Sequence, residues 1–225
     1  MKNANSEFIK RIKTTIPDDM VYSPILNNEK DRVKFIKRCE KVIRSSMEYR
    51  DYIQYLKENV DMAHCAFYQK VSSNDSKRVK IEIHHEPFTL YDYVEVVVDR
   101  FITEGLPLND LMISDEIMEL HYNNQVGLIP LSKTIHEVVH NSNKIVIPLN
   151  MVYGDYASFL SDPKYESYVE DLYDKLEVKL NASKNVTEET FDALRKEFTY
   201  LELEGVSAVE KQKTEKELLL EEGVA

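Results

Sequence analysis

Tryptophan is absent from this 225-residue chain, and glycine and proline occur only five and seven times. Glycine and proline mark many turns, so their scarcity disfavours a sandwich or barrel of many short strands and favours helices. Cysteine is nearly absent too, because Cys39 and Cys65 are the only two and form no C-x-x-C pair. The sequence therefore predicts neither a disulfide framework nor a thiolate zinc site, and a reducing compartment is the simplest setting.

Long apolar runs are also missing. A membrane-spanning helix needs about 18 apolar residues in succession, and no segment of the chain approaches that length. The first thirty residues mix lysine and arginine with polar side chains and contain no apolar stretch typical of a secretion signal. We therefore expect a cytoplasmic protein that has no membrane partner.

Basic residues are outnumbered, with 29 Lys and Arg against 40 Asp and Glu, and the net charge is −11. Nucleic-acid affinity rests largely on basic side chains that displace counterions, so unselective wrapping of DNA or RNA is disfavoured. The charge is uneven, however, because residues 1–50 carry twelve basic and seven acidic side chains, whereas residues 151–225 carry nine and eighteen. This gradient could orient the protein on a polyanion, although a solvated charged surface is the more common explanation.

Apolar residues at a spacing of three to four dominate much of the chain and predict helices. The predicted helical stretches are residues 29–59 as one or two helices, 90–105, 109–123 with Asn109 as cap, 153–179 with a turn near Asp162-Pro163, and 187–200. Residues 202–225 are acidic and rich in lysine. We expect this last segment to be either a frayed tail or a helix that docks on a protein partner.

Short strands are predicted between these helices. Residues 66–71 and 79–84 flank a polar turn and would form a hairpin, and residues 126–131 are typical of an edge strand. Residues 144–149 are a further candidate. Ser132 or Thr134 is placed to cap the next helix, which carries His136 and His140. The predicted fold class is therefore α+β, mostly helical with a small module of two strands and a helix.

Four of the six histidines occur in a pattern typical of a metal site. His84 and His85 end a predicted strand, and His136 and His140 are spaced i and i+4, so both project from one helix face. Neutral imidazole is a good ligand for zinc and similar metals, and three ligands leave a position for substrate or water. We expect His84, His136 and His140 to hold one divalent ion (zinc, nickel or magnesium). His85, at the strand end, would be free to act as a base.

These residues resemble the HNH, or ββα-metal, nucleases, and in particular the nuclease-colicin branch. The resemblance lies in Ile81-Glu82-Ile83-His84-His85-Glu86-Pro87, Gly127-Leu128-Ile129-Pro130-Leu131-Ser132 and His136-x-x-x-His140. In that family a strand ends in Asp-His or His-His, a second strand reads approximately N-L-x-P-L-C, and the next helix supplies the remaining ligands. The resemblance implies a ββα-metal module that hydrolyses phosphodiester bonds, with DNA as the partner.

The resemblance also implies roles for single residues. His85 would be the general base that activates water, while the metal acts as a Lewis acid at the scissile phosphate. The central asparagine of the family falls at Gly127, so Asn124 or Asn123 would have to replace it as a catalytic residue. The cysteines that often accompany such modules are replaced by Ser132 and Ile135.

Basic side chains precede the first histidine strand. Lys77, Arg78 and Lys80 could hold DNA phosphates beside the metal, and a charged turn explains them equally well. Modules of this kind are typical of phages and mobile elements, so the resemblance implies a phage-encoded protein in the host cytoplasm. The chain would then comprise a basic helical arm (1–60), an HNH-like module (61–150) with a helical insertion (90–123), and an acidic helical region (151–225).

Two other functions fit parts of the sequence. The missing asparagine and the net charge of −11 favour a non-catalytic phage component, either DNA-binding or structural, that keeps the metal as a structural element. The segment His136-Glu137-Val138-Val139-His140 also matches the H-E-x-x-H motif of zinc proteases. That motif needs a third metal ligand downstream. The chain has no histidine after His140, so an acid such as Asp155 or Glu166 would have to be this ligand.

Overall fold

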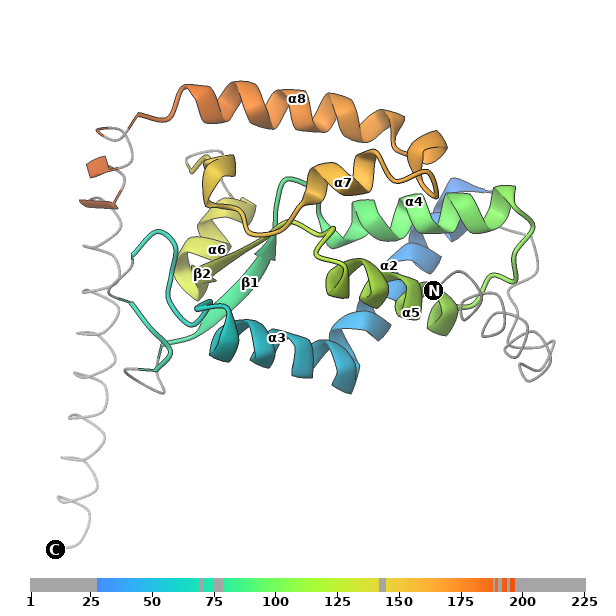
Figure 1. Cartoon of the computed structure of the whole chain (residues 1–225), viewed down its shortest axis with the longest axis horizontal. Coiled ribbons are helices and arrows are strands. Elements are labelled where there is room, and N and C mark those ends of the chain that lie inside the picture. Colours follow the sequence, from blue (N-terminus) through green and yellow to red (C-terminus); the bar gives the residue numbers. More distant parts are fainter. Residues whose placement is uncertain are drawn as a thin grey trace, which may run out of the picture. The chain divides into compact units, whose positions relative to one another are not determined.

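The computed structural model describes residues 28–68, 71–74, 79–141 and 145–187, together with residues 189, 192, 193, 195 and 196. The elements in this part are α2 (Glu29–Ser45), α3 (Met47–Asn59), β1 (Ile81–His85), α4 (Leu90–Thr103), α5 (Asp110–Tyr122), β2 (Leu128–Ser132), α6 (Lys133–Asn141), η2 (Leu149–Met151), α7 (Tyr156–Leu160), η3 (Glu166–Tyr168) and α8 (Glu170–Lys184) (Figure 1). The predicted α+β class, mostly helical with a small sheet, is confirmed. Among the described residues, no helix has the length and apolar character needed to cross a membrane.

The chain forms two compact units that are interleaved in the sequence. Unit 1 comprises Met1–Met62, Ile83–Ile129 and Leu149–Leu180, and unit 2 comprises Ala63–Glu82, Pro130–Pro148 and Asn181–Ala225. The boundary between the units passes through both strands, since it falls after Glu82 in β1 and after Ile129 in β2. The division into residues 1–60, 61–150 and 151–225 stays a prediction.

Unit 1 is organised around three helices. Helices α2, α4 and α5 each contact the other two (Figure 1). Their apolar stripes supply side chains that are fully removed from solvent, namely Ile36, Ile43, Val94, Val97, Ile113 and Ile117. Burial of apolar surface is the main force that holds such helices together, so the spacing of three to four seen in the sequence marks the core of this unit correctly.

Polar side chains set the ends of these helices. Ser46 ends α2, and its hydroxyl accepts a hydrogen bond from the Tyr49 amide at 3.0 Å to begin α3, so residues 29–59 form two helices. Thr89 and Asp92 form a reciprocal capping box at the start of α4, and Asn109 caps α5 as predicted. Each cap satisfies an amide that the first helical turn leaves without a partner.

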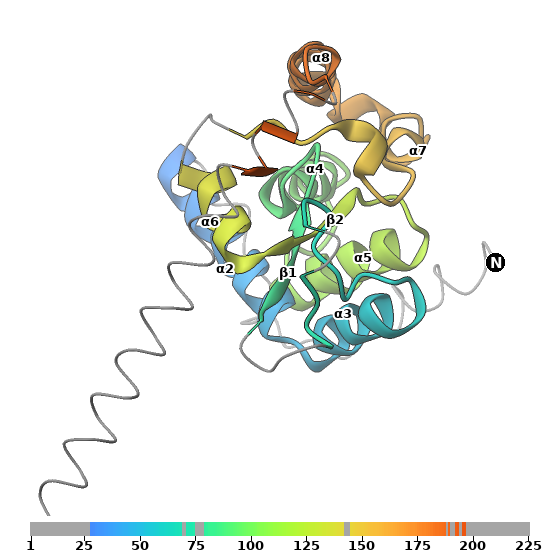
Figure 2. The same cartoon turned by 90° about the vertical axis from the view of Figure 1, so that its left-hand side faces the viewer.

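Strands β1 and β2 form a two-stranded sheet and lie side by side (Figure 2). The pairing is antiparallel, because the Glu86 amide donates to the Gly127 carbonyl while the Lys133 amide donates to the Lys80 carbonyl. Among the described residues β1 pairs with β2, and residues 66–68 and 71 form no strand, so the predicted hairpin between residues 66–71 and 79–84 is wrong in this part of the chain. β2 carries apolar residues that are buried on both of its faces, so this pairing removes apolar surface from water.

Two further predictions differ from the structure. The expected strand over 144–149 is absent from its described part, where residues 145–148 have no regular structure and Pro148 lacks the amide that a ladder requires. The expected helix over 153–179 is divided into α7, η3 and α8, because Asp162 turns the chain by accepting hydrogen bonds from the Lys164 and Tyr165 amides. The helix predicted over 187–200 lies mostly outside the described residues, and the tail 202–225 lies wholly outside them.

Candidate metal centre

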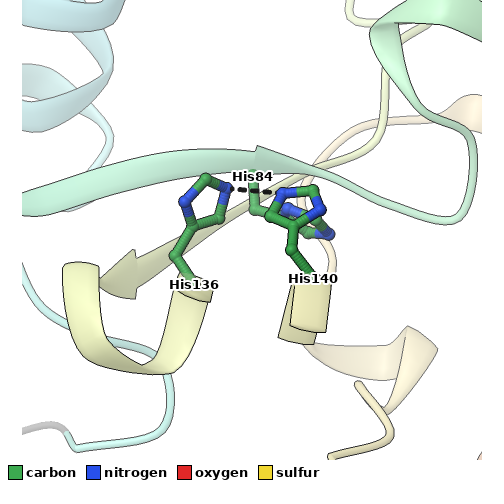
Figure 3. Close-up of side chains that lie close together, drawn as sticks. All are labelled: His84, His136 and His140. Atoms are coloured by element: carbon green, nitrogen blue, oxygen red, sulfur yellow. Dashed lines mark hydrogen bonds between the residues drawn. The ribbon is translucent and has the colours of Figure 1, made fainter. Parts of the chain in front are cut away.

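Helix α6 positions two of the predicted ligands. The Ser132 hydroxyl accepts a hydrogen bond from the Ile135 amide, which confirms Ser132 as the cap of this helix. Ile135 is buried, while His136 is half-buried and His140 is exposed. Their i, i+4 spacing places both rings together, with 3.1 Å between the two Nε2 atoms (Figure 3). The local pattern of the sequence therefore produces the pair that it predicts.

Strand β1 supplies the third imidazole. Successive strand side chains point to opposite faces, so Glu82 and His84 share one face of β1. One nitrogen from each of His84, His136 and His140 lies within 4.8 Å of the others, and Figure 3 shows the three rings gathered together. The structure thus brings together the three residues predicted as ligands.

Carboxylates lie behind two of these imidazoles. His136 Nδ1 is 2.6 Å from Glu82 Oε2, and His84 Nε2 is 3.4 Å from Glu86 Oε2. A carboxylate only accepts hydrogen bonds when ionised, so Glu82 favours the tautomer of His136 that carries its proton on Nδ1. The lone pair then lies on Nε2, the atom that faces His140. A carboxylate that orients a histidine in this way is typical of metal ligands.

Glu86 is a buried acid with two polar neighbours. Burial by itself would raise the pKa of Glu86, but the hydrogen bonds with His84 and Lys179 and the positive charge of Lys179 outweigh it, so the pKa is lowered. Lys179 Nζ lies 2.7 Å from Glu86 Oε1. Glu86 is therefore ionised at neutral pH and presents a negative charge to the His84 ring.

The donor set suits a borderline metal ion. Three neutral imidazoles are ligands that zinc and nickel prefer, whereas magnesium prefers oxygen donors. In a tetrahedral zinc site with Zn–N distances of about 2.0–2.1 Å, neighbouring ligand nitrogens lie about 3.3 Å apart. The Nε2 atoms of His136 and His140, at 3.1 Å, are close to that separation. The three side chains are therefore of a kind that could hold a divalent ion.

His85 lies on the other face of β1 and is only 4% exposed. Its Nε2 is 3.2 Å from His121 Nε2, and its ring stacks on Tyr49 with the two planes 11° apart. His121 Nδ1 is 2.7 Å from the Ile117 carbonyl, which can only accept, so this nitrogen carries the proton. In the neutral pair His85 must then donate from Nε2. His85 is not a member of the three-histidine group.

The partner of His85 is His121, and the sequence did not predict this pair. His121 is 1% exposed, and burial lowers its pKa from 6.5 to about 4, although its hydrogen bond to Ile117 acts in the opposite direction. The ring is therefore neutral at pH 7. No local signal could have identified this pair, because His85 and His121 are separated by 36 positions.

The position of the family asparagine holds a glycine that leaves no room for a side chain. A Cβ atom built on Gly127 would lie 1.9 Å from the Glu86 carbonyl oxygen, and the Gly127 amide donates to the Tyr93 hydroxyl. Asn124, the proposed substitute, lies in the turn after α5 with a positive φ of 60°. Its carbonyl accepts from the Asp155 amide at 2.7 Å.

The remaining predicted site residues lie around α6 and β1. Lys80 is exposed immediately before β1, whereas Lys77 and Arg78 fall outside the described residues. Glu137, the base in the protease interpretation, is exposed and forms an ion pair with Lys133 on its own helix at 3.6 Å. The third ligand of the group is the upstream His84, and neither Asp155 nor Glu166 belongs to it.

Comparison with known proteins gives one match. The model of a family described as Bacteriophage G278-like virion protein matches residues 2–215. No curated protein and no solved structure matches the chain. The match supports the phage origin expected from the sequence. Because it covers nearly the whole chain, the protein belongs to the Bacteriophage G278-like virion protein family.

Proposed function

We propose that the protein is a non-catalytic structural component of a phage virion, in which His84, His136 and His140 bind one divalent metal ion. The observation that carries this proposal is the convergence of three imidazole nitrogens within 4.8 Å in a chain of a virion protein family.

Helix α6 buries few of its own side chains. It is nine residues long, and among its side chains only Ile135 is buried. Helices of this length are marginal in water without tertiary contacts. A metal ion that binds the folded state but not the unfolded chain stabilises the fold by mass action. These two facts support a structural role for the ion at this helix.

The surroundings of His85 and Gly127 favour the non-catalytic function. A general base must reach the water that it activates, directly or through one other water, whereas His85 is buried and directs Nε2 at His121. An asparagine side chain that would orient such a base has no space at Gly127. The proposed metal ligands therefore lack the supporting residues that hydrolysis requires.

An HNH-type endonuclease is the second candidate. It is favoured by the order of β1, β2 and α6, which matches the strand, strand and helix of that family, and by the position of the three histidines on these elements. In that case DNA is the partner and Lys80 contacts its phosphates. Docking of a protein partner on residues 202–225 likewise stays a prediction.

Metal binding is tested on the full chain. The apo protein is prepared with a chelator, and zinc, nickel and magnesium are titrated by calorimetry. We expect one zinc or nickel ion per chain, weak magnesium binding, and loss of binding in His140→Ala. Glu137→Ala is the matched control, because Glu137 lies on the same helix but outside the group. Failure of the native chain to bind any of the three ions, or equal binding by His140→Ala, would contradict the metal proposal.

Catalysis is tested separately with plasmid DNA and the same three metals. We expect no cleavage by the metal-loaded protein. Metal-dependent cleavage that disappears in both His140→Ala and His85→Ala, with circular dichroism showing that both variants are folded, would establish the nuclease instead. The virion assignment is tested by mass spectrometry of purified particles of the encoding phage, in which the chain must be present.

A further inference from the structure

Unit 1 contains a cavity of about 450 Å³ whose walls are rich in tyrosine. Its lining residues come from α3, from the end of α5 with the turn that follows it, and from the segment before α7. They are Asp51, Tyr52, Tyr55, Leu56, His121, Tyr122, Asn124 and Tyr153. This cavity has no role in the metal site or in the function proposed above.

The cavity has a buried floor and an exposed aromatic rim. Tyr52, Leu56 and His121 are buried, whereas Tyr55, Tyr122 and Tyr153 are exposed. The described part of the chain has one other exposed tyrosine, Tyr173. Large aromatic side chains that gather at a surface hollow are typical of binding sites, because they bury much area at a low cost in conformational entropy.

Contacts within the protein fix the orientation of two of these rings. The Tyr52 hydroxyl donates to the His121 carbonyl at 3.2 Å, and the Tyr52 and Tyr122 rings meet edge to face with their centroids 5.6 Å apart. The Tyr122 hydroxyl donates to Glu48 Oε1 at 3.0 Å. The rings are thus held in place before any ligand arrives, which reduces the entropy lost on binding.

The lining residues carry one negative charge and no positive charge, although the charge of Arg44 nearby acts on His121. Asp51 is an acid among the lining residues, none of the eight is a lysine or arginine, and His121 is neutral at pH 7. The carboxylate of Glu48 adds a second negative charge beside the Tyr122 hydroxyl. Burial, the hydrogen bond to Glu48 and the charges of Glu48 and Asp51 all raise the pKa of Tyr122, which is the expected effect of such surroundings.

We propose that this cavity binds the guanidinium group of an arginine side chain presented by a partner protein. Guanidinium is planar, weakly hydrated and positively charged, so it stacks on tyrosine faces while it pairs with a carboxylate. Asp51 supplies the carboxylate, and Tyr55, Tyr122 and Tyr153 supply the ring faces. An ammonium group is more strongly hydrated and gains less from the same rings.

The test uses the full chain and two blocked tripeptides that differ in one group. Acetyl-Gly-Arg-Gly-amide carries the guanidinium, and the citrulline analogue has the same shape without the charge. The chain has no tryptophan, so its fluorescence comes from its 14 tyrosines, four of which line the cavity. We expect the arginine peptide to change the tyrosine signal saturably and to bind at least about tenfold more tightly than the citrulline peptide, in line with the energies of close charge pairs.

Variants locate the binding site. Asp51→Asn keeps the side-chain shape and removes the charge, and we expect it to weaken binding of the arginine peptide about tenfold. Glu58→Gln is the matched control, because Glu58 is an exposed acid on the same helix outside the cavity, and it should leave binding unchanged. Backbone amide shifts in the NMR spectrum should move at residues 51, 55 and 124.

Several outcomes would overturn the proposal. These are no binding of the arginine peptide, equal binding of the citrulline peptide, or an Asp51→Asn variant that is folded and binds normally. Spermidine is included as a cation that is not part of a protein, and if it binds as tightly as the arginine peptide, the site is not specific for guanidinium. None of these results depends on whether the three histidines bind a metal.

Discussion

Two pairs of histidines in this protein have nearly the same geometry and different surroundings. The Nε2 atoms are 3.1 Å apart in the pair His136 and His140 and 3.2 Å apart in the pair His85 and His121. The first pair is accessible to solvent and has a carboxylate, that of Glu82, behind one ring. Both members of the second pair are buried. A short distance between two imidazoles therefore does not by itself identify a metal site.

The two pairs differ in whether a third imidazole lies nearby and in how far they are exposed to solvent. The exposed pair has His84 as a third imidazole within 4.8 Å. The buried pair is enclosed by aromatic rings, with Tyr49 and Tyr52 both edge-on to His121 at centroid distances of 5.6 and 5.3 Å. The exposed pair is thus suited to bind an ion, whereas the buried pair is suited to hold the interior together through one hydrogen bond. The following predictions test this contrast.

The largest effect is expected for His121→Ala. The substitution creates a cavity and leaves the donor of His85 without its acceptor, so we expect the free energy of unfolding to fall by about 3 kcal/mol or more. Urea denaturation measures this loss. If the free energy of unfolding falls no more than it does for a substitution at an exposed residue, the buried pair does not stabilise the core.

The second-largest effect is expected on acidification, which should lower the free energy of unfolding through the buried pair. The pKa of His121 is about 4 in the folded protein against 6.5 for an exposed ring. The unfolded chain therefore takes up the proton first, and the stabilisation is complete above pH 6.5 and is lost as the pH falls towards 4. The loss amounts to about 3 kcal/mol. The difference in stability between the native chain and His121→Ala should accordingly shrink over this interval, and a constant difference would contradict the assignment.

Zinc should act on the exposed pair alone. At a free concentration 100-fold above its dissociation constant, zinc should raise the free energy of unfolding by about 2.7 kcal/mol. The same addition to His140→Ala should have no effect, while His121→Ala should still respond if it is folded. Thermal denaturation with and without zinc measures the shift. Stabilisation of His140→Ala by zinc would place the ion elsewhere.

Glu82→Gln should have a smaller effect that is confined to metal binding. The amide can still accept a hydrogen bond from His136 Nδ1 but no longer provides a negative charge, so zinc affinity should fall about tenfold. Stability of the metal-free protein should not change. Glu137→Gln is the control, and an equal effect of the two substitutions would remove the role given to Glu82.

The smallest effect is expected for His140→Ala without metal. The side chain is exposed, so the free energy of unfolding should change by less than about 0.5 kcal/mol. A chelator must be present during the urea titration. A loss comparable to that of His121→Ala would mean that the two pairs do not differ in kind.

Local features of the sequence predicted much of the fold. The starts of α5 and α6 follow from Asn109 and Ser132, which were predicted as caps and bond to amides within three residues, whereas the capping box of Thr89 and Asp92 at α4 was not predicted. Alternation along a strand also indicates that Glu82 lies on the same face as His84. Contacts over such short distances depend little on the rest of the chain.

Long-range pairing could not be predicted in the same way. β1 has a nearby candidate strand, residues 66–71, and yet pairs with β2. The choice depends on the apolar surface that each pairing buries, which is a property of the packed protein. The cavity lined by Asp51, Tyr122 and Tyr153 was not predicted either, since its walls come from three separate segments.

The sequence by itself determined the local directions of four histidines, because helical spacing and strand alternation place His136 with His140 and direct His84 and His85 to opposite faces. Only the tertiary structure decided what each face meets. One face of β1 meets α6, while the other places His85 against His121, 36 positions away. The reason is that neighbouring bonds fix local direction, whereas burial across the whole chain selects the partner.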